Sequence, residues 1–292
     1  MTYPNLAPFV APAAPRSEIW RSLIGLALIV AFYLGALFGG LGLVGLVAGK
    51  LELAVVMAAM ARAGTPEGLS MVLATFAPLA LGTLLVTRVL HRRPAASLLG
   101  QGAGRDFARV FPPLLGLTLL MVPFSFLDPH LGKSTPLLVL LTWLPLALPL
   151  LFVQIASEEL LFRGYLLQQI AARWRHPALW MVLPAAIFGA LHYSPGENGP
   201  SAIFLGLWAM GFGILAADLT ARTGNLGPAL AFHFANNLSA MFLVGLYGQL
   251  DGLSLYTLVV NSHDLGQMAP YLALDSVSML VFWLAARLRL RR

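Results

Sequence analysis

Two adjacent glutamates, Glu158 and Glu159, lie at the end of a long apolar stretch, and Arg163 follows four residues after the second. Residues four apart share a helix face, so we expect Glu159 and Arg163 to form an ion pair. Glu158 points about 100° away, since a helix has 3.6 residues per turn, and its own face carries no cation. An unpaired buried carboxylate is suited to act as a general base. Alternatively, the three charges form an interfacial cluster that ends the helix.

Two later apolar segments each contain a histidine. His192 ends the sequence Phe188-Gly-Ala-Leu-His192, just before a turn, so we expect it at a helix end that faces a polar cavity. His233 and Asn237 are four residues apart and share a face, so they could both donate hydrogen bonds to one developing oxyanion. Asn236 could take the place of Asn237. Alternatively, His192 is a hydrogen-bonded core residue and the second pair is a clamp between helices.

The elements that carry these residues are predicted to be membrane helices. The chain has 292 residues, of which 59% are hydrophobic and 10% are charged, and its mean hydropathy is +0.81. Its apolar runs are about 20 residues long and do not alternate with polar residues, which favours helices over a barrel. Cysteine is absent, which excludes disulfides and thiolate metal sites. We predict one integral membrane domain over residues 1–292, in a bacterial inner membrane.

The predicted fold is all-α, with about eight transmembrane helices and both termini in the cytoplasm. Residues 1–17 are expected to be a flexible tail, and residues 51–61 a short helix at the membrane surface or a helix extension. The eight predicted spans are 23–48, 69–90, 110–127, 136–156, 178–193, 202–217, 226–246 and 269–288.

The distribution of basic residues supports this topology. The chain has 18 lysines and arginines, and the predicted topology puts only Lys50, Arg62 and Lys133 outside. The other 15 lie on the cytoplasmic side, as the positive-inside rule requires. Because they flank apolar spans, the net charge of +6 does not indicate a nucleic-acid partner.

Together, Glu-Glu-x-x-x-Arg, Phe-x-x-x-His and His-x-x-x-Asn, in this order, resemble the motifs of the CPBP intramembrane proteases. This family includes the type II CAAX prenyl endopeptidases and bacterial bacteriocin-immunity (Abi) proteins. The resemblance covers about residues 150–246, the motif-bearing core. It implies that Glu158 activates a water molecule, which His192 helps to hold or activate.

The resemblance further implies that Glu159 and Arg163 orient the site, and that His233 and Asn237 stabilise the oxyanion. Phe188 and Phe162 are the predicted substrate contacts. We favour a metal-independent glutamate-type protease with no cofactor, because the chain has no His-Glu-x-x-His sequence. The alternative is a zinc site, whose ligands would be Glu158, His192 and His233.

The predicted function is an intramembrane endopeptidase that hydrolyses a peptide bond in a membrane-associated peptide or a protein C-terminal tail. The expected partners are the lipid bilayer and a membrane-bound substrate: a prenylated tail, a C-terminal sorting signal or a bacteriocin-like peptide. One alternative is a proton-coupled transporter with Glu158 and His192 as relay groups. Another is a non-catalytic immunity or scaffold protein of the same fold.

Two features do not fit the predicted spans. Glu158 falls at the cytoplasmic end of its span, whereas His233 lies ~10 Å and His192 ~21 Å into theirs, at 1.5 Å per residue. For the three to meet, the fourth helix must run deeper than predicted, or the fifth must tilt or begin in the cytosol. The second feature is Asp275, an acid in the last span for which the sequence suggests no partner.

Overall fold

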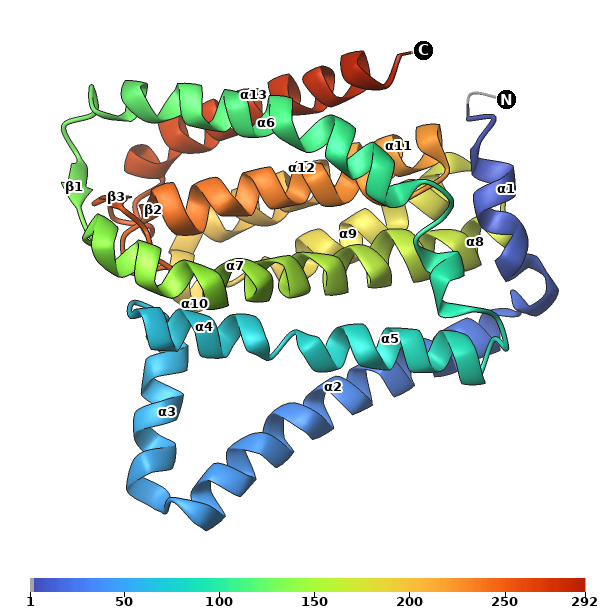
Figure 1. Cartoon of the computed structure of the whole chain (residues 1–292), viewed down its shortest axis with the longest axis horizontal. Coiled ribbons are helices and arrows are strands. Elements are labelled where there is room, and N and C mark those ends of the chain that lie inside the picture. The colour runs from blue at the N-terminus through green and yellow to red at the C-terminus, as the bar shows by residue number, and fades with distance from the viewer. Residues whose placement is uncertain (1–2, 292) are drawn as a thin grey trace.

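Long helices dominate the computed structural model, which describes residues 3–291 (Figure 1). Most of them run side by side between two ends of the molecule, and a small sheet lies at one of these ends, whereas α2 diverges from the bundle and α3 leads back from its far end to α4 (Figure 1). The helices are α1 (Leu6–Val10), α2 (Ile19–Val47), α3 (Lys50–Arg62), α4 (Pro66–Ala74), α5 (Ala77–Val89), α6 (Ala103–Ser125), α7 (Leu137–Glu159), α8 (Leu167–Arg173), α9 (Leu183–Leu191), α10 (Pro195–Asn198), α11 (Ala202–Thr223), α12 (Gly227–Leu238) and α13 (Leu265–Leu290). The strands are β1 (Leu131–Lys133), β2 (Val244–Leu246) and β3 (Tyr256–Leu258).

Within the described residues, six helical stretches are long and apolar enough to cross a membrane. The shortest has 23 residues, and at 1.5 Å per residue this exceeds the ~30 Å hydrocarbon core of a bilayer. The prediction of an all-α polytopic integral membrane protein is therefore confirmed. The six stretches are Ile19–Val47, Pro66–Val89, Ala103–Ser125, Leu137–Arg173, Pro195–Thr223 and Leu265–Leu290.

The other two predicted spans are helical but too short to count as full crossings. The fifth, Ala178–Leu191, is followed by His192 as the C-cap residue. The helix does not continue, because Pro195 disfavours the helical conformation of Ser194 before it. The seventh is α12 with the π-helical turn Ser239–Leu243, after which the chain becomes β2. Its first residues are already buried inside the protein. The expected count of about eight spans thus becomes six full-length spans and two shorter helices.

The fourth helix is longer than predicted. α7 continues through a π-helical segment, Leu160–Leu166, into α8, so that helical structure runs without a break from Leu137 to Arg173. Glu158 is therefore in the interior of this helix, 15 residues before Arg173, or ~22 Å from that end at 1.5 Å per residue. This depth is similar to that of His192 in its own helix, which removes the mismatch between these two residues. His233 can reach them because α12 begins inside the protein.

The N-terminal segment is packed rather than loose. Within residues 3–16, α1 and the 3₁₀ turn Ala11–Arg16 lie against α8 and α11, and Phe9 and Ala13 are buried. The hydroxyl of Tyr3 donates a hydrogen bond of 2.8 Å to Asp218 on α11. The prediction of a flexible tail is wrong for these residues, because their apolar side chains pack against α8 and α11.

The described chain ends and the small sheet lie at opposite ends of the molecule (Figure 1). Both described chain ends lie at one end of the bundle (Figure 1). There Arg21 donates to the carbonyl of Leu90, and Arg289 donates to the carbonyl of Arg109. Lys133 lies at the opposite end in β1, which pairs antiparallel with β3, while β2 pairs parallel with β3. The prediction that both chain ends are cytoplasmic stays a prediction, because the structure contains no membrane.

Candidate active site

A cavity of about 600 Å³ opens between the helices that carry the three motifs. Its walls come from α4, α6, α7, α9, α11, α12 and α13, together with the segments around β2 and β3, and most of its lining is apolar. Its polar lining includes residues of the three motifs, their neighbours on α7 and α12, and one acid from α13. These residues are Gln154, Glu158, His192, His233, Asn236, Asn237 and Asp275.

The two adjacent glutamates have different surroundings. Glu158 lines the cavity, whereas Glu159 is fully buried behind it. Arg163 donates a hydrogen bond of 2.9 Å to Glu159 and is itself buried, so the pair is closed off from the cavity. The guanidinium also lies 4.8 Å from the ring centre of Phe188, in a cation–π contact. The i,i+4 ion pair expected from the sequence is therefore present.

His233 bridges the two glutamates, an arrangement that the sequence did not suggest. Its Nδ1 lies 2.8 Å from Oε1 of Glu159, and its Nε2 lies 3.6 Å from Oε2 of Glu158. An ionised carboxylate only accepts hydrogen bonds, so Nδ1 donates to Glu159. Nε2 is then left facing Glu158 at the cavity. The expected face of Glu158 carried no cation, but an imidazole from α12 reaches it.

Asn237 lies one helical turn beyond His233 and contacts α7. Its Nδ2 donates a hydrogen bond of 3.1 Å to Oε1 of Gln154, and Asn236 donates one of 3.1 Å to Oδ1 of Asn237. Gln154 was not predicted as a site residue. It is four residues before Glu158, on the same helix face, and this spacing was the available signal.

His192 reaches the same cavity from the end of α9. Its Nδ1 donates to the carbonyl of Phe188 over 2.8 Å, and its ring packs against that of Phe188 at 4.5 Å between centroids. The ring of His233 lies 6.2 Å from the same phenyl group. Phe188 thus stands between the two histidines and lines the cavity. Phe162 lies behind it, 5.1 Å from its centroid, and contacts Phe188 rather than the cavity.

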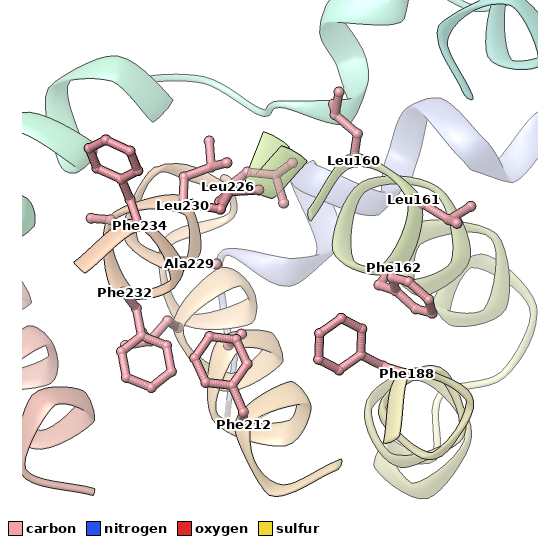
Figure 2. Close-up of a cluster of buried hydrophobic side chains, with 14 of the residues drawn as sticks. Leu160, Leu161, Phe162, Phe188, Phe212, Leu226, Ala229, Leu230, Phe232 and Phe234 are labelled. Carbon is pink, nitrogen blue, oxygen red and sulfur yellow. The ribbon is translucent and has the colours of Figure 1, made fainter. Parts of the chain in front are cut away.

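Aromatic side chains of α9, α11 and α12 cluster beside these residues (Figure 2). Phe212 of α11 stacks on Phe232 at 4.6 Å between centroids and meets the ring of His233 at 4.9 Å. The helices α9 and α11 approach closely at a glycine: a Cβ added to Gly189 would lie 2.5 Å from the carbonyl oxygen of Gly206. Close packing of α9 on α11 therefore fixes where Phe188 and His192 enter the cavity.

The predicted zinc ligands are not arranged around one point. Among residues 3–291, no group of three His, Cys, Asp or Glu side chains is placed to hold a metal ion. His233 directs Nδ1 to Glu159, and the rings of both histidines pack against Phe188. The side chains as placed do not fit a zinc site, so the reaction below contains no step through a metal.

The arrangement combines a cavity-facing carboxylate with an imidazole, two amides and a second histidine. Glu158 can accept a proton at the cavity wall, while the amide nitrogen of Asn237 and Nε2 of His233 lie on the same side of the cavity as hydrogen-bonding groups. Glu159 accepts a hydrogen bond from Nδ1 of His233 and pairs with Arg163, and neither Glu159 nor Arg163 lines the cavity. Such a set suits general acid–base chemistry on a carbonyl compound.

Comparison with known proteins agrees with this description. Residues 140–239 match the family of type II CAAX prenyl endopeptidase Rce1-like proteins, and all three motifs fall inside this segment. The uncharacterized protein YyaK of Bacillus subtilis (strain 168) is 26% identical over 182 residues, which cover 59% of this chain and 61% of that protein. No solved structure gives a significant match. The family match confirms the resemblance to the CPBP family that the motifs indicated.

Proposed function

Because the motif-bearing core is Rce1-like and of the CPBP type, we propose that the protein is an intramembrane endopeptidase whose general base is Glu158. One observation carries the assignment of the base. Of two adjacent glutamates, Glu158 lines the cavity beside Nε2 of His233, while Glu159 is sealed behind it in an ion pair with Arg163.

In the proposed reaction, Glu158 removes a proton from a water molecule as its oxygen attacks the carbonyl carbon of the scissile peptide bond. His192 helps to hold that water. The carbonyl oxygen becomes an oxyanion, which accepts hydrogen bonds from Asn237 and from the protonated Nε2 of His233. The C–N bond then breaks, and Glu158 passes its proton to the leaving nitrogen. The carboxylate of Glu159 stabilises the imidazolium form of His233 through Nδ1.

The proposed substrate is a membrane-bound peptide or the C-terminal tail of a membrane-associated protein. Its apolar residues would contact the lining of the cavity, to which Phe188, Trp208 and Phe212 contribute. A bacterial cell membrane is the proposed location. A prenylated tail, a sorting signal and a bacteriocin-like peptide all meet these requirements.

The test compares membrane proteomes and peptide cleavage for the wild type and Glu158→Gln. A general base contributes about 10²–10⁴-fold to the rate, so cleavage should fall by that factor, while the amount of folded protein should not change. Glu67→Gln is the matched control, since Glu67 is exposed at the start of α4. Wild-type cleavage rates in Glu158→Gln would contradict the proposal.

A further inference from the structure

Asp275 lies in the middle part of α13, and the proposed reaction does not use its carboxylate. Among the described residues, it has neither a hydrogen-bond partner nor a charged partner. A charge at the centre of a membrane helix costs about 2.5–3.5 kcal/mol on insertion scales. An acid at this position is therefore expected to face a cavity and to have a function.

The periodicity of α13 places Asp275 on the face that lines the active-site cavity. Residues of this helix that line the cavity recur mostly at spacings of three and four, as one helix face requires. The opposite side of the helix carries exposed apolar side chains that suit contact with lipid, such as Val277, Val281 and Leu284. On the cavity side are Met268, Tyr271, Leu272, Leu274, Asp275, Ser278, Met279 and Phe282.

Asp275 and Glu158 line the same cavity. Met279 of α13 lies beside Gly211 of α11, and the next residue, Phe212, meets the ring of His233 beside Glu158. Asp275 is four residues before Met279, or ~6 Å along the helix at 1.5 Å per residue. A peptide bound for attack beside Glu158 would therefore extend past Asp275 within the same cavity.

No lysine or arginine among the described lining residues balances Asp275. Among the described residues that line the cavity, Glu158 and Asp275 are acids, His192 and His233 are imidazoles, and none is lysine or arginine. His233 lies beside Glu158, which leaves Asp275 without a counter-charge. In an apolar environment, an unbalanced carboxylate attracts a cation much more strongly than it would in water.

We propose that Asp275 is a specificity-determining residue, which binds the ammonium of a lysine or the guanidinium of an arginine within an otherwise apolar substrate segment. This inference rests on the proposed function, because the ligand is the peptide that the site would cleave. The apolar flanks of that segment would contact the lining of the cavity, and the cation would neutralise the acid. A peptide with a neutral residue at this place would leave the carboxylate unpaired, and an acidic residue would be repelled.

A binding experiment tests the inference apart from catalysis. The protein carries Glu158→Gln, so bound peptides are not cleaved, and it is reconstituted in liposomes. The probes are N-acetylated fluorescent apolar peptides with one central arginine or lysine, and the same peptides with citrulline or norleucine instead. We expect the basic peptides to bind at least about tenfold more tightly, a difference of 1.4 kcal/mol. The arginine and lysine arms distinguish the two cations.

When Asp275→Asn is added to the Glu158→Gln protein, the ratio of the affinities for basic and neutral peptides should fall to about one. Asp275→Glu should preserve the preference for basic peptides. Asp275→Lys should reverse it in favour of peptides with a central glutamate. Asp264→Asn is the matched control, because it removes a carboxylate from the start of the same helix outside the cavity while keeping a capping side chain. This control should retain the wild-type preference.

Equal binding of basic and neutral peptides, or a preference that survives in Asp275→Asn, would overturn the inference. Cleavage by the protein with Glu158 intact is measured separately on the same peptides. Basic peptides that bind through Asp275 but are never cleaved would refute the proposed protease activity and leave the cation site established. Cleavage without any preference for a basic residue would refute the role of Asp275 alone.

Discussion

At the scale of single residues, helical spacing accounts for contacts within one helix and not for those between helices. The pairing of Glu159 with Arg163 could be predicted because both residues are on one helix, four positions apart. His233 contacts both glutamates, and it is 74 residues away from Glu159 in the sequence. No local pattern encodes it, because it depends on how α12 packs on α7. The same holds for Gln154 and Asn237, and for the entry of Asp275 into the cavity.

Glu159 and Arg163 should be needed for stability as well as activity. Changing either one leaves a buried charge without its partner, at a cost of about 3–5 kcal/mol. We therefore expect Glu159→Gln and Arg163→Ala to lower the melting temperature of the purified protein and its yield. Glu158→Gln is the comparison. The carboxylate of Glu158 faces the cavity, so we expect this substitution to leave the melting temperature unchanged. Equal melting temperatures for all three variants would show that the ion pair is not structural.

Asn237 should contribute to the rate more than its neighbour. Loss of one oxyanion donor lowers kcat by about 10²–10³, so we expect this for Asn237→Ala, with a smaller change in KM. Asn236→Ala is the matched variant, because it removes an amide from the same turn. That amide donates a hydrogen bond to Asn237. A larger loss of kcat in Asn236→Ala would assign the donor role to Asn236, the alternative that the sequence left open.

At the scale of elements, the positions of all eight apolar segments could be predicted, but their lengths could not. Hydropathy falls after Ala156 because charged residues begin there, yet the helix continues to Arg173. The charges at 158–163 are satisfied by α12 and by each other, so they do not mark a membrane boundary. Likewise, α9 and α12 are apolar enough to resemble spans but are shorter than the bilayer is thick. Packing against other helices, not lipid, surrounds much of α12.

The contact of α9 with α11 should depend on Gly189. A methyl group there would lie 2.5 Å from the backbone oxygen of Gly206, so the two helices must separate. We expect Gly189→Ala to destabilise the protein by about 1–3 kcal/mol, as for overpacked cores, and to lower cleavage because Phe188 and His192 are on the displaced helix. Gly211→Ala is the matched change in α11, since its methyl group would meet only Met279 at an ordinary 3.6 Å. Melting temperatures and cleavage rates of both variants provide the measurement, and a stable, active Gly189→Ala would show that the close approach is not required.

At the scale of the whole molecule, the arginine distribution predicts the orientation in the membrane. Two pairs of segments predicted to be cytoplasmic are in contact, through Arg21 with Leu90 and through Arg289 with Arg109. The sheet end holds Lys133, and Gly252 donates a hydrogen bond to Ala63 there. One of the 15 basic residues predicted to be cytoplasmic, Arg163, is instead buried inside the bundle, where it pairs with Glu159. The side of the membrane that each end of the bundle faces stays a prediction.

The orientation in the membrane can be tested because the chain contains no cysteine. We expect a cysteine at Gln101 to react with a membrane-impermeant maleimide only after the cytoplasmic side is made accessible, and one at Lys133 to react from outside in intact cells. Both positions are exposed. Gly100 is a poor choice, since its φ is +74° and a Cβ there would lie 2.3 Å from the carbonyl oxygen of Gly224. Labelling at 101 but not at 133 from outside would invert the topology, and the entrance of the cavity would then have to be assigned to the opposite leaflet.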